Sequence, residues 1–263
     1  MTEPVYNTGA AGYDEFFGQV TRLYIPALLR AAKVGAGQCV LDVATGTGAA
    51  AEAALAVVGP SGSVIGGDVS PNMLEVARTR LANLPIRLEQ FDAHSLPFDD
   101  DTFDAVICQL GLMFFDDPAL ALGEFCRVLR PGGVAAVSIN STPERSLFLR
   151  VGTAIARHVT DKAELFARPF SIRDADRLHG LFDGAGFHGI QVTDEIRKIG
   201  FASFDDYFSG IEQGATISGQ EYVRLPEEVG RQVREEVRHG LPAPDADGSF
   251  AIEMQLLIGS GCA

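Results

Sequence analysis

The chain has 263 residues, of which 46% are hydrophobic, so it can bury the core of a single α/β domain. Its formal net charge of −14 argues against a nucleic-acid binder, because neutralising phosphates needs a basic face. No apolar run reaches the roughly 18 residues of a membrane span and no signal-peptide pattern opens the chain, so we expect a cytoplasmic protein without stable membrane insertion. The four cysteines contain no C-x-x-C pair, so we expect reduced thiols and no metal site.

The N-terminal part of the chain predicts one helix. Residues 1–18 are rich in Gly, Tyr and Phe without a clear period. From Val20, apolar residues recur at helical spacing to about residue 31, and Pro26 bends or delays the helix. Gly35-Ala36-Gly37 ends it.

A glycine turn follows. Residues 39–43 predict a buried parallel strand, and the alanine-rich run 49–58 predicts a helix, an order that places a nucleotide-like ligand at the carboxyl end of a first strand. Gly46 and Gly48 lack a Cβ atom, so the ligand can lie close to the backbone. Asp42 beside the turn would repel a pyrophosphate, but it suits a ligand with an ammonium and a sulfonium group.

The second strand, residues 63–67, ends in Asp68, and Ser70 caps a helix that has Pro71 at its first position and runs to about Leu81. Asp68 lies roughly 20 residues past the glycine turn, where an acidic residue can accept both ribose hydroxyls. NAD-dependent enzymes and methyltransferases share this device, so Asp68 predicts a ribose-containing ligand without choosing between the two.

The alternation of strand and helix continues to about residue 140 and then stops. Between Leu81 and residue 140 we expect strands at 86–91, 103–110 and 134–139 and a helix opened by Asp117 and Pro118. Beyond residue 140 we expect helical stretches near 147–158 and 161–166 and a strand around 189–194. Helices then begin after Ser203 and from Pro226, and a period-two strand covers 250–258.

Four segments in this order resemble the class I S-adenosylmethionine (SAM) methyltransferases, and most of all the small-molecule type that includes the ubiquinone/menaquinone-biosynthesis enzymes. They are Asp42 to Gly48 as motif I, Asp68, Asp92-Ala93 followed by Leu96-Pro97-Phe98, and the strand–helix block that ends in Leu129-Arg130-Pro131-Gly132-Gly133. The resemblance implies a Rossmann-like α/β fold with a seven-stranded, mostly parallel sheet in the order 3-2-1-4-5-7-6. Helices flank that sheet, and its last strand is antiparallel.

The resemblance also implies one methyltransferase domain with four parts. These are an N-terminal helical cover (1–34), a SAM-binding core (35–140), a helical insertion that covers the substrate (141–180) and a C-terminal completion of the sheet (181–263).

SAM is the implied cofactor, and S-adenosylhomocysteine (SAH) is the implied product. The residues expected to bind it are Asp42, Ala44, Thr45, Gly46, Gly48, Asp68, Val69, Met73, Asp92, Ala93, His94 and Gln109. The residues expected to contact the methyl acceptor are Tyr6, Tyr13, Phe17, Gly111 and Met113, and the candidates for a catalytic base are Tyr13, His94 and His158. Many relatives place a histidine after the fourth strand, whereas Leu110 to Phe115 are apolar here, which favours catalysis by positioning or by a base from elsewhere.

The predicted reaction moves a methyl group from SAM to an O, N, S or C nucleophile of a small, lipophilic or aromatic molecule. Two alternatives remain at this point: an NAD(P)-dependent oxidoreductase, and a SAM-binding protein without transfer activity. No nucleic-acid partner is expected, and the protein is expected to be a monomer or a homodimer.

Overall fold

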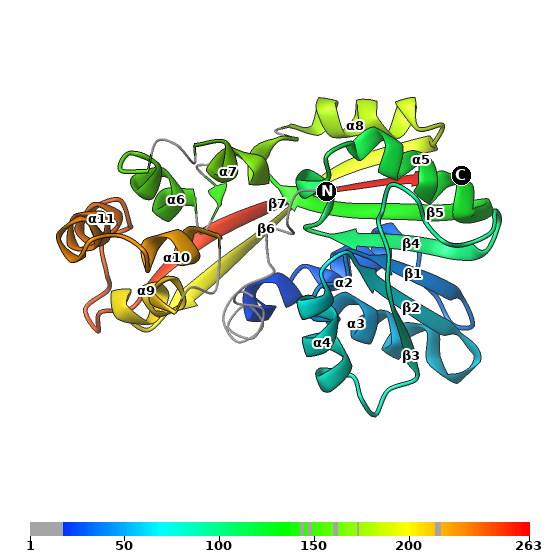
Figure 1. The fold of residues 1–263 in the computed structure, drawn as a ribbon, viewed down its shortest axis with the longest axis horizontal. Coiled ribbons are helices and arrows are strands. Elements are labelled where there is room, and N and C mark those ends of the chain that lie inside the picture. Colours follow the sequence, from blue (N-terminus) through cyan, green and yellow to red (C-terminus); the bar gives the residue numbers. More distant parts are fainter. Residues whose placement is uncertain (1–17, 143–144, 147–148, 160–162, 173, 214–216) are drawn as a thin grey trace.

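A computed structural model describes residues 18–142, 145–146, 149–159, 163–172, 174–213 and 217–263 of the chain (Figure 1). Its centre is a seven-stranded sheet in the order β3-β2-β1-β4-β5-β7-β6. The strands are β1 (Cys39–Val43), β2 (Ser63–Asp68), β3 (Ile86–Gln90), β4 (Phe103–Gln109), β5 (Leu129–Asn140), β6 (His188–Phe201) and β7 (Phe250–Cys262). Strand β7 pairs antiparallel with β5 and β6, and the other pairs are parallel. The predicted fold class and strand order are confirmed.

The described helices are α2 (Ile25–Ala31), α3 (Ala49–Val58), α4 (Pro71–Arg80), α5 (Pro118–Val128), α6 (Leu149–Ala156), α7 (Ala163–Ala167), α8 (Ala175–Gly184), α9 (Phe204–Glu212), α10 (Ile217–Tyr222) and α11 (Glu227–His239). Four of them, α4, α5, α8 and α9, begin after a capping Ser or Asp side chain. The Ser70 hydroxyl accepts the Met73 N–H at the start of α4, and the Asp117 carboxylate accepts two N–H groups at the start of α5. Residues 18–22 are also helical, residues 23 and 24 form a turn, and Pro26 lies in the first turn of α2, so the helix predicted from Val20 is interrupted just before Pro26.

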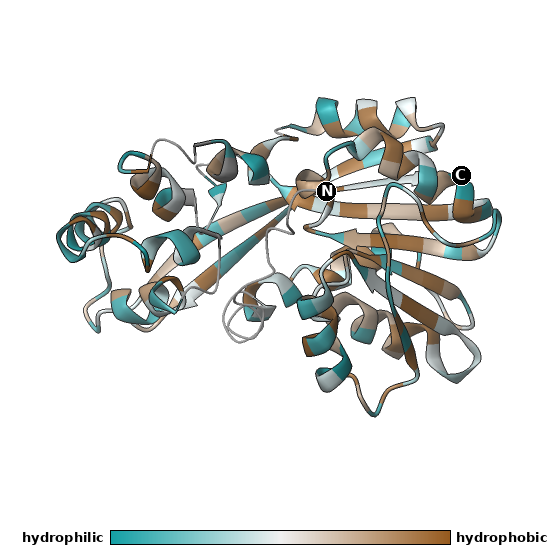
Figure 2. Ribbon diagram, in the orientation of Figure 1, coloured by the Kyte–Doolittle hydropathy of each residue, from teal (hydrophilic) through white to brown (hydrophobic). Residues whose placement is uncertain are grey.

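Two hydrophobic clusters fill the two faces of the sheet. Val40 and Ala105 point to the face covered by α2 and α3, whereas their neighbours Leu41 and Val106 point to the face covered by α5 and α8. Hydrophobic residues follow the central strands in Figure 2. Burial on both faces explains why β1 and β4 are continuous apolar runs in the sequence.

Strand β6 is longer than predicted. The expected end near Asp194 is wrong, because β6 continues to Phe201 in register with β7, where Phe201 pairs with Phe250. The sequence hides this extension because β6 is an edge strand that carries charged residues such as Arg197 and Lys198, a common way to keep an exposed edge from pairing. Strand β5 also begins earlier than predicted, at Leu129.

A second helical layer surrounds the far ends of β6 and β7. In Figure 1 the helices α6, α7, α9, α10 and α11 gather there, away from β1 to β4, and α10 and α11 contact α6. Helix α8 packs on β6 and β7 instead. The helical layer therefore extends beyond the 141–180 insertion to α9–α11, and its role as a substrate cover stays a prediction.

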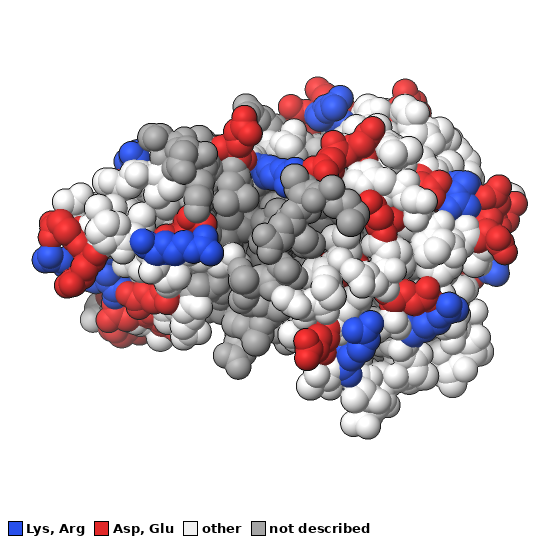
Figure 3. Space-filling view, in the orientation of Figure 1, with Lys and Arg blue, Asp and Glu red and all other residues white. Residues whose placement is uncertain are grey.

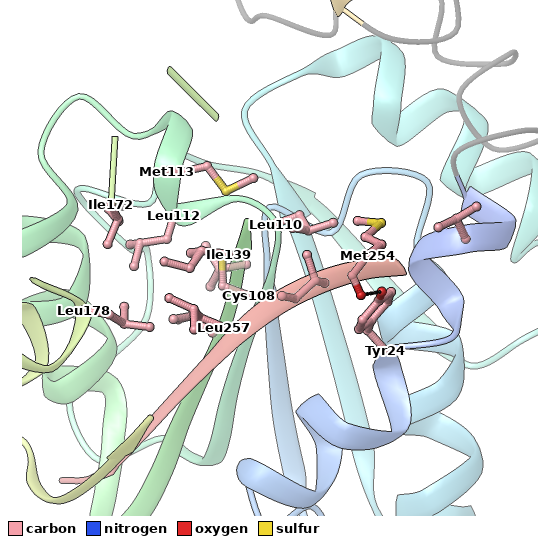
Figure 4. Packing of buried hydrophobic residues seen from close by; sticks show 14 of the residues in the cluster. Tyr24, Cys108, Leu110, Leu112, Met113, Ile139, Ile172, Leu178, Met254 and Leu257 are labelled. Carbon is pink, nitrogen blue, oxygen red and sulfur yellow. Dashed lines mark hydrogen bonds between the residues drawn. The ribbon is translucent and has the colours of Figure 1, made fainter. Parts of the chain in front are cut away.

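Tyr24 joins the first helical region to the long β6–β7 pair. Its ring is fully buried, and its hydroxyl donates a 2.7 Å hydrogen bond to the Met254 carbonyl (Figure 4). The Arg197 guanidinium lies 5.6 Å from the centre of the Tyr24 ring, which adds a cation–π contact from β6.

The surface in Figure 3 mixes acidic and basic side chains, and the described residues on that face form no continuous basic patch. None of the helices in the described ranges combines the length and the apolar character needed to cross a membrane.

Candidate functional site

The carboxyl ends of three neighbouring strands form the candidate site. Strand β1 pairs in parallel with both β2 and β4, and Asp42 lies opposite Gly66 on one side and Ile107 on the other. The segments that follow β1, β2 and β4 therefore meet at one edge of the sheet, the edge at which α/β folds bind ligands. The predicted residues Asp42, Asp68 and Gln109 come together there, as the strand order requires.

Asp42 is a buried carboxylate with one oxygen left free. Its side chain has no exposed surface, and Oδ2 accepts a 2.6 Å hydrogen bond from the Thr45 hydroxyl. The other oxygen, Oδ1, has no hydrogen-bond partner in the described part of the chain. Burial raises the pKa of Asp42 to about 7, against the lowering effect of the Thr45 bond. A buried carboxylate with a free oxygen favours a cationic ligand nearby.

The two glycines of the turn serve different purposes. Gly46 has a φ of +57°, and a Cβ atom placed on it would meet nothing within 4 Å. Gly48 has a φ of +84°, and a Cβ atom there would clash with Leu81 Cδ1 at the end of α4. Gly46 therefore leaves open space in which a ligand can approach the backbone, whereas Gly48 makes room for α4.

Strained backbone marks the same edge of the sheet. Ala44 after β1 and Leu110 after β4 have φ values of +56° and +54°, which side chains with a Cβ atom rarely adopt. The two strand ends touch at Gly111, where a Cβ atom would lie 2.6 Å from the Ala44 Cβ. Such strain costs of order 1–3 kcal/mol at each position and concentrates at functional sites.

Asp68 is fixed towards the glycine turn. Its Oδ2 accepts the Gly46 N–H at 2.9 Å and its Oδ1 accepts the Ser70 N–H at 2.9 Å. Burial raises the pKa of Asp68, although these N–H groups counteract the rise. Each carboxylate oxygen keeps a lone pair for a further donor such as a ribose hydroxyl. The neighbouring Val69 is 45% exposed, while Met73 in α4 is buried.

The segment after β3 holds Asp92 and His94 against each other. Asp92 Oδ1 accepts the His94 backbone N–H at 2.9 Å and lies 2.6 Å from His94 Nδ1. The backbone N–H of His94 is the largest influence that holds the pKa of Asp92 below its usual range. His94 Nε2 accepts the Asp117 N–H at 3.2 Å, so this network assigns the ring proton to Nδ1 and occupies both nitrogens.

The end of β4 is apolar and buried. Leu110, Leu112 and Met113 belong to one hydrophobic cluster with Cys108 and Ile139 (Figure 4). Burial raises the pKa of the Cys108 thiol. Such buried apolar side chains can exclude water from a neighbouring reacting group, but they supply no base at neutral pH.

The remaining predicted residues lie as follows. Gln109 Nε2 donates to the Thr21 carbonyl at 2.7 Å, and Ala93 is buried. His158 is exposed just after α6, the helix that contacts α10 and α11. Tyr6, Tyr13 and Phe17 lie outside the described residues. Within the described ranges no group of three or more His, Cys, Asp or Glu residues could hold a metal ion.

Sequence reasoning missed the contacts that fasten the loop after β4. The Ser171 hydroxyl donates to the Met113 carbonyl at 2.9 Å, and Arg168 pairs with Asp116 at 2.6 Å. Arg168 begins the short 3₁₀ helix η5 (Arg168–Phe170). These partners lie more than 50 residues apart along the chain and follow no periodic pattern, so no signal in the sequence joins them.

Residues 41–137 match the methyltransferase domain family. The demethylmenaquinone methyltransferase of Staphylococcus carnosus is 33% identical over 205 residues, which are 72% of this chain and 85% of that protein. The chain belongs to the class I SAM-dependent methyltransferases. A ubiquinone/menaquinone biosynthesis C-methyltransferase of Marinomonas sp. is 35% identical over 203 residues, 70% of this chain and 81% of that protein.

Solved structures share the fold of this methyltransferase. A Bacillus halodurans protein assigned as a methyltransferase superposes with a TM-score of 0.59 at 22% identity, covering 90% of this chain and 97% of its own. The phosphoethanolamine N-methyltransferase 2 of Haemonchus contortus, solved with SAH, gives a TM-score of 0.61 at 18% identity, covering 97% of this chain and 58% of its own. SAM is therefore the cofactor, and the oxidoreductase alternative is not favoured. The free Asp42 oxygen and the open space at Gly46 fit a ligand with a cationic amino-acid end.

Proposed function

We propose that this methyltransferase transfers the methyl group of SAM to a ring carbon of a hydroxylated aromatic acceptor of the quinol type. The observation that carries the proposal is the identity of 33–35% over more than four-fifths of the length of two methyltransferases named for demethylmenaquinone and for ubiquinone/menaquinone biosynthesis. The apolar side chains of Leu110, Leu112 and Met113 at the end of β4 support a lipophilic acceptor.

The proposed cofactor site follows the strand ends. Asp68 accepts the ribose hydroxyls, and Val69 with the Asp92-Ala93 segment contacts the adenine. The Asp42 side of the turn attracts the ammonium group of the amino-acid end. The other residues proposed to line the cofactor site are Ala44, Thr45, Gly46, Gly48, Met73, His94 and Gln109. The residues proposed to contact the acceptor are Gly111 and Met113, together with Tyr6, Tyr13 and Phe17 of the N-terminal segment.

Bound SAM supplies an electrophilic methyl group on its sulfonium, so the chain chiefly has to hold two reactants in line. The fixed Asp68 and the strained turn at Ala44 orient one reactant, and the apolar end of β4 excludes water around the other. Positioning of this kind can lower a barrier by up to about 7–11 kcal/mol.

A hydroxyl on the acceptor ring activates the ring carbon more strongly once its proton is removed, and a base can add roughly a 100- to 10,000-fold acceleration. Both ring nitrogens of His94 are occupied, and His158 is exposed near α10 and α11. Of the three candidate bases we therefore retain Tyr13 as the proposed base.

The test uses SAM with a deuterated methyl group and a short-chain demethylmenaquinol, with the oxidised quinone as the control acceptor. We expect the label on a ring carbon of the quinol and none on the quinone, as read by fragmentation mass spectrometry. Label on a quinol oxygen, or no transfer by a protein that binds SAH, would overturn the proposed acceptor.

We further propose that the protein acts in the cytoplasm, as a monomer or homodimer, on a small molecule rather than a nucleic acid. The net charge of −14 supports the last point.

A further inference from the structure

Arg127 lies near the end of α5, and every N–H donor of its guanidinium group forms a hydrogen bond either with Glu124 of the same helix or with the segment 96–100. Nε donates to Glu124 Oε1 at 2.7 Å, and Nη2 donates to Glu124 Oε2 at 2.8 Å and to the Leu96 carbonyl at 3.0 Å. Nη1 donates to the Phe98 carbonyl and to Asp100 Oδ1, both at 2.8 Å. A guanidinium has five N–H donors in a rigid plane, so no donor remains for another role.

Glu124 completes this arrangement from the same helix. Its Oε2 also accepts the Leu96 N–H at 2.8 Å, so Leu96 is held through both its N–H and its carbonyl. The hydrogen bond from Arg127 is the main influence that holds the pKa of Glu124 below its usual range. The Glu124 carboxylate is therefore ionised at neutral pH, and its hydrogen bonds with Arg127 and with the Leu96 N–H are charge-assisted.

The other end of the same segment is fastened to the start of α5. His94 bonds to Asp92 through Nδ1 and accepts the Asp117 N–H through Nε2. Between these two anchors, residues 92–100 form only an isolated bridge from Asp92 to Ser95 and belong to no helix or strand. Helix α5 thus supplies hydrogen bonds to this segment at both of its ends.

We propose that Arg127, together with Glu124, is a positioning residue for the cofactor: it holds residues 96–100 so that Asp92 and Ala93 meet the adenine of SAM. This inference rests on the adenine contact of the proposed function. Arg127 touches none of the proposed cofactor-binding side chains, and its effect passes through the Leu96–Asp100 backbone.

Arg127→Lys tests the proposal because it keeps the charge and loses the planar fork. A lysine ammonium has three donors at one point and cannot reach acceptors spread over Glu124, Leu96, Phe98 and Asp100. Arg130→Lys is the matched control, since Arg130 lies three residues further on, is half exposed and pairs with Asp104 at 2.6 Å.

We expect Arg127→Lys to weaken SAH binding about tenfold in calorimetry, and to raise the KM for SAM by the same factor. The kcat at saturating SAM and the KM for the short-chain demethylmenaquinol should stay at wild-type values, as should every constant of Arg130→Lys. A fall in kcat together with a change in the acceptor KM would indicate a general structural role and overturn the proposal. If Arg127→Lys does not fold, Glu124→Gln carries the same expectations.

Asp92→Asn separates this inference from the proposed site. Weaker SAH binding by both Asp92→Asn and Arg127→Lys supports the positioning role. Weaker binding by Asp92→Asn alone overturns the role of Arg127 and leaves the site intact. Wild-type affinity in Asp92→Asn overturns the adenine contact, and the inference with it.

Discussion

Replacing Asp42 by Asn should make the cofactor-free protein more stable at alkaline pH and weaken its affinity for SAM. Asp42 is fully buried, and one of its oxygens has no hydrogen-bond partner in the described part of the chain. Asparagine has nearly the same volume and can accept the Thr45 hydrogen bond through its carbonyl oxygen. It carries no charge that burial would penalise.

The expected gain follows from the pKa of Asp42. Burial raises it from 3.8 to about 7, so the folded state binds a proton more tightly than the unfolded chain between these values. The free energy of unfolding of the wild type therefore falls as the pH rises from about 4 to about 7. Three pKa units correspond to about 4 kcal/mol. The free energy of unfolding of Asp42→Asn should therefore exceed that of the wild type by about 1 kcal/mol near pH 4.5 and by about 4 kcal/mol near pH 8.5.

Urea unfolding of the cofactor-free proteins at the two pH values measures this gain. Asp104→Asn is the control, because this substitution should change the free energy of unfolding in the opposite direction. Burial acts to raise the pKa of Asp104, but the Cys39 N–H and Arg130 together hold it below its usual value. That variant should therefore lose stability above about pH 4. An Asp42→Asn protein less stable than the wild type near pH 8.5 would refute the interpretation of Asp42 as an uncompensated buried charge. Unchanged SAH affinity in calorimetry would refute its role beside the ligand.

Three further substitutions test the turn and the core. Gly48→Ala should destabilise the fold by roughly 1–3 kcal/mol in urea unfolding, because its φ of +84° disfavours any side chain and the new Cβ atom would displace the Leu81 side chain; an unchanged midpoint would contradict this. Gly46→Ala meets no atom within 4 Å and should cost only about 1 kcal/mol for its positive φ, yet lose most SAH binding in calorimetry; wild-type affinity would speak against the approach of the ligand there. Tyr24→Phe leaves the buried Met254 carbonyl without its hydroxyl donor and should cost about 1–2 kcal/mol, whereas a stability equal to wild type would show that water replaces the bond.

The sequence predicts the sheet well, and it places the proposed cofactor-binding residues at one edge of that sheet, because both depend on local patterns. Strand β1 is an apolar run ended by glycines, and Asp68 follows it at the spacing of a ribose-binding carboxylate. Once β1 lies between β2 and β4, parallel pairing brings Asp42, Asp68 and Gln109 to one edge without further information. Ser70 and Asp117 cap their helices as predicted for the same reason, since a cap depends on residues two or three positions away.

Features that depend on contacts between distant residues could not be predicted. Three of the five donors of Arg127 reach back 27 to 31 residues to a loop without periodicity, and Ser171 reaches 58 residues back to Met113. The length of β6 was underestimated because its outer residues are charged and its pairing partner β7 lies beyond three intervening helices. The separate roles of the two glycines in the turn could not be predicted either, because they too depend on a residue distant in the sequence. The sequence marks Gly46 and Gly48 alike, and only the position of Leu81 separates their roles.

Calorimetry of the purified, cofactor-stripped protein with SAH and, separately, with NADH tests the central claim most directly. The account predicts a Kd for SAH in about the micromolar range, its loss in Asp68→Ala, and no binding of NADH. Binding of NADH without SAH, or SAH binding that Asp68→Ala leaves unchanged, would contradict the assignment of this strand edge as a SAM site.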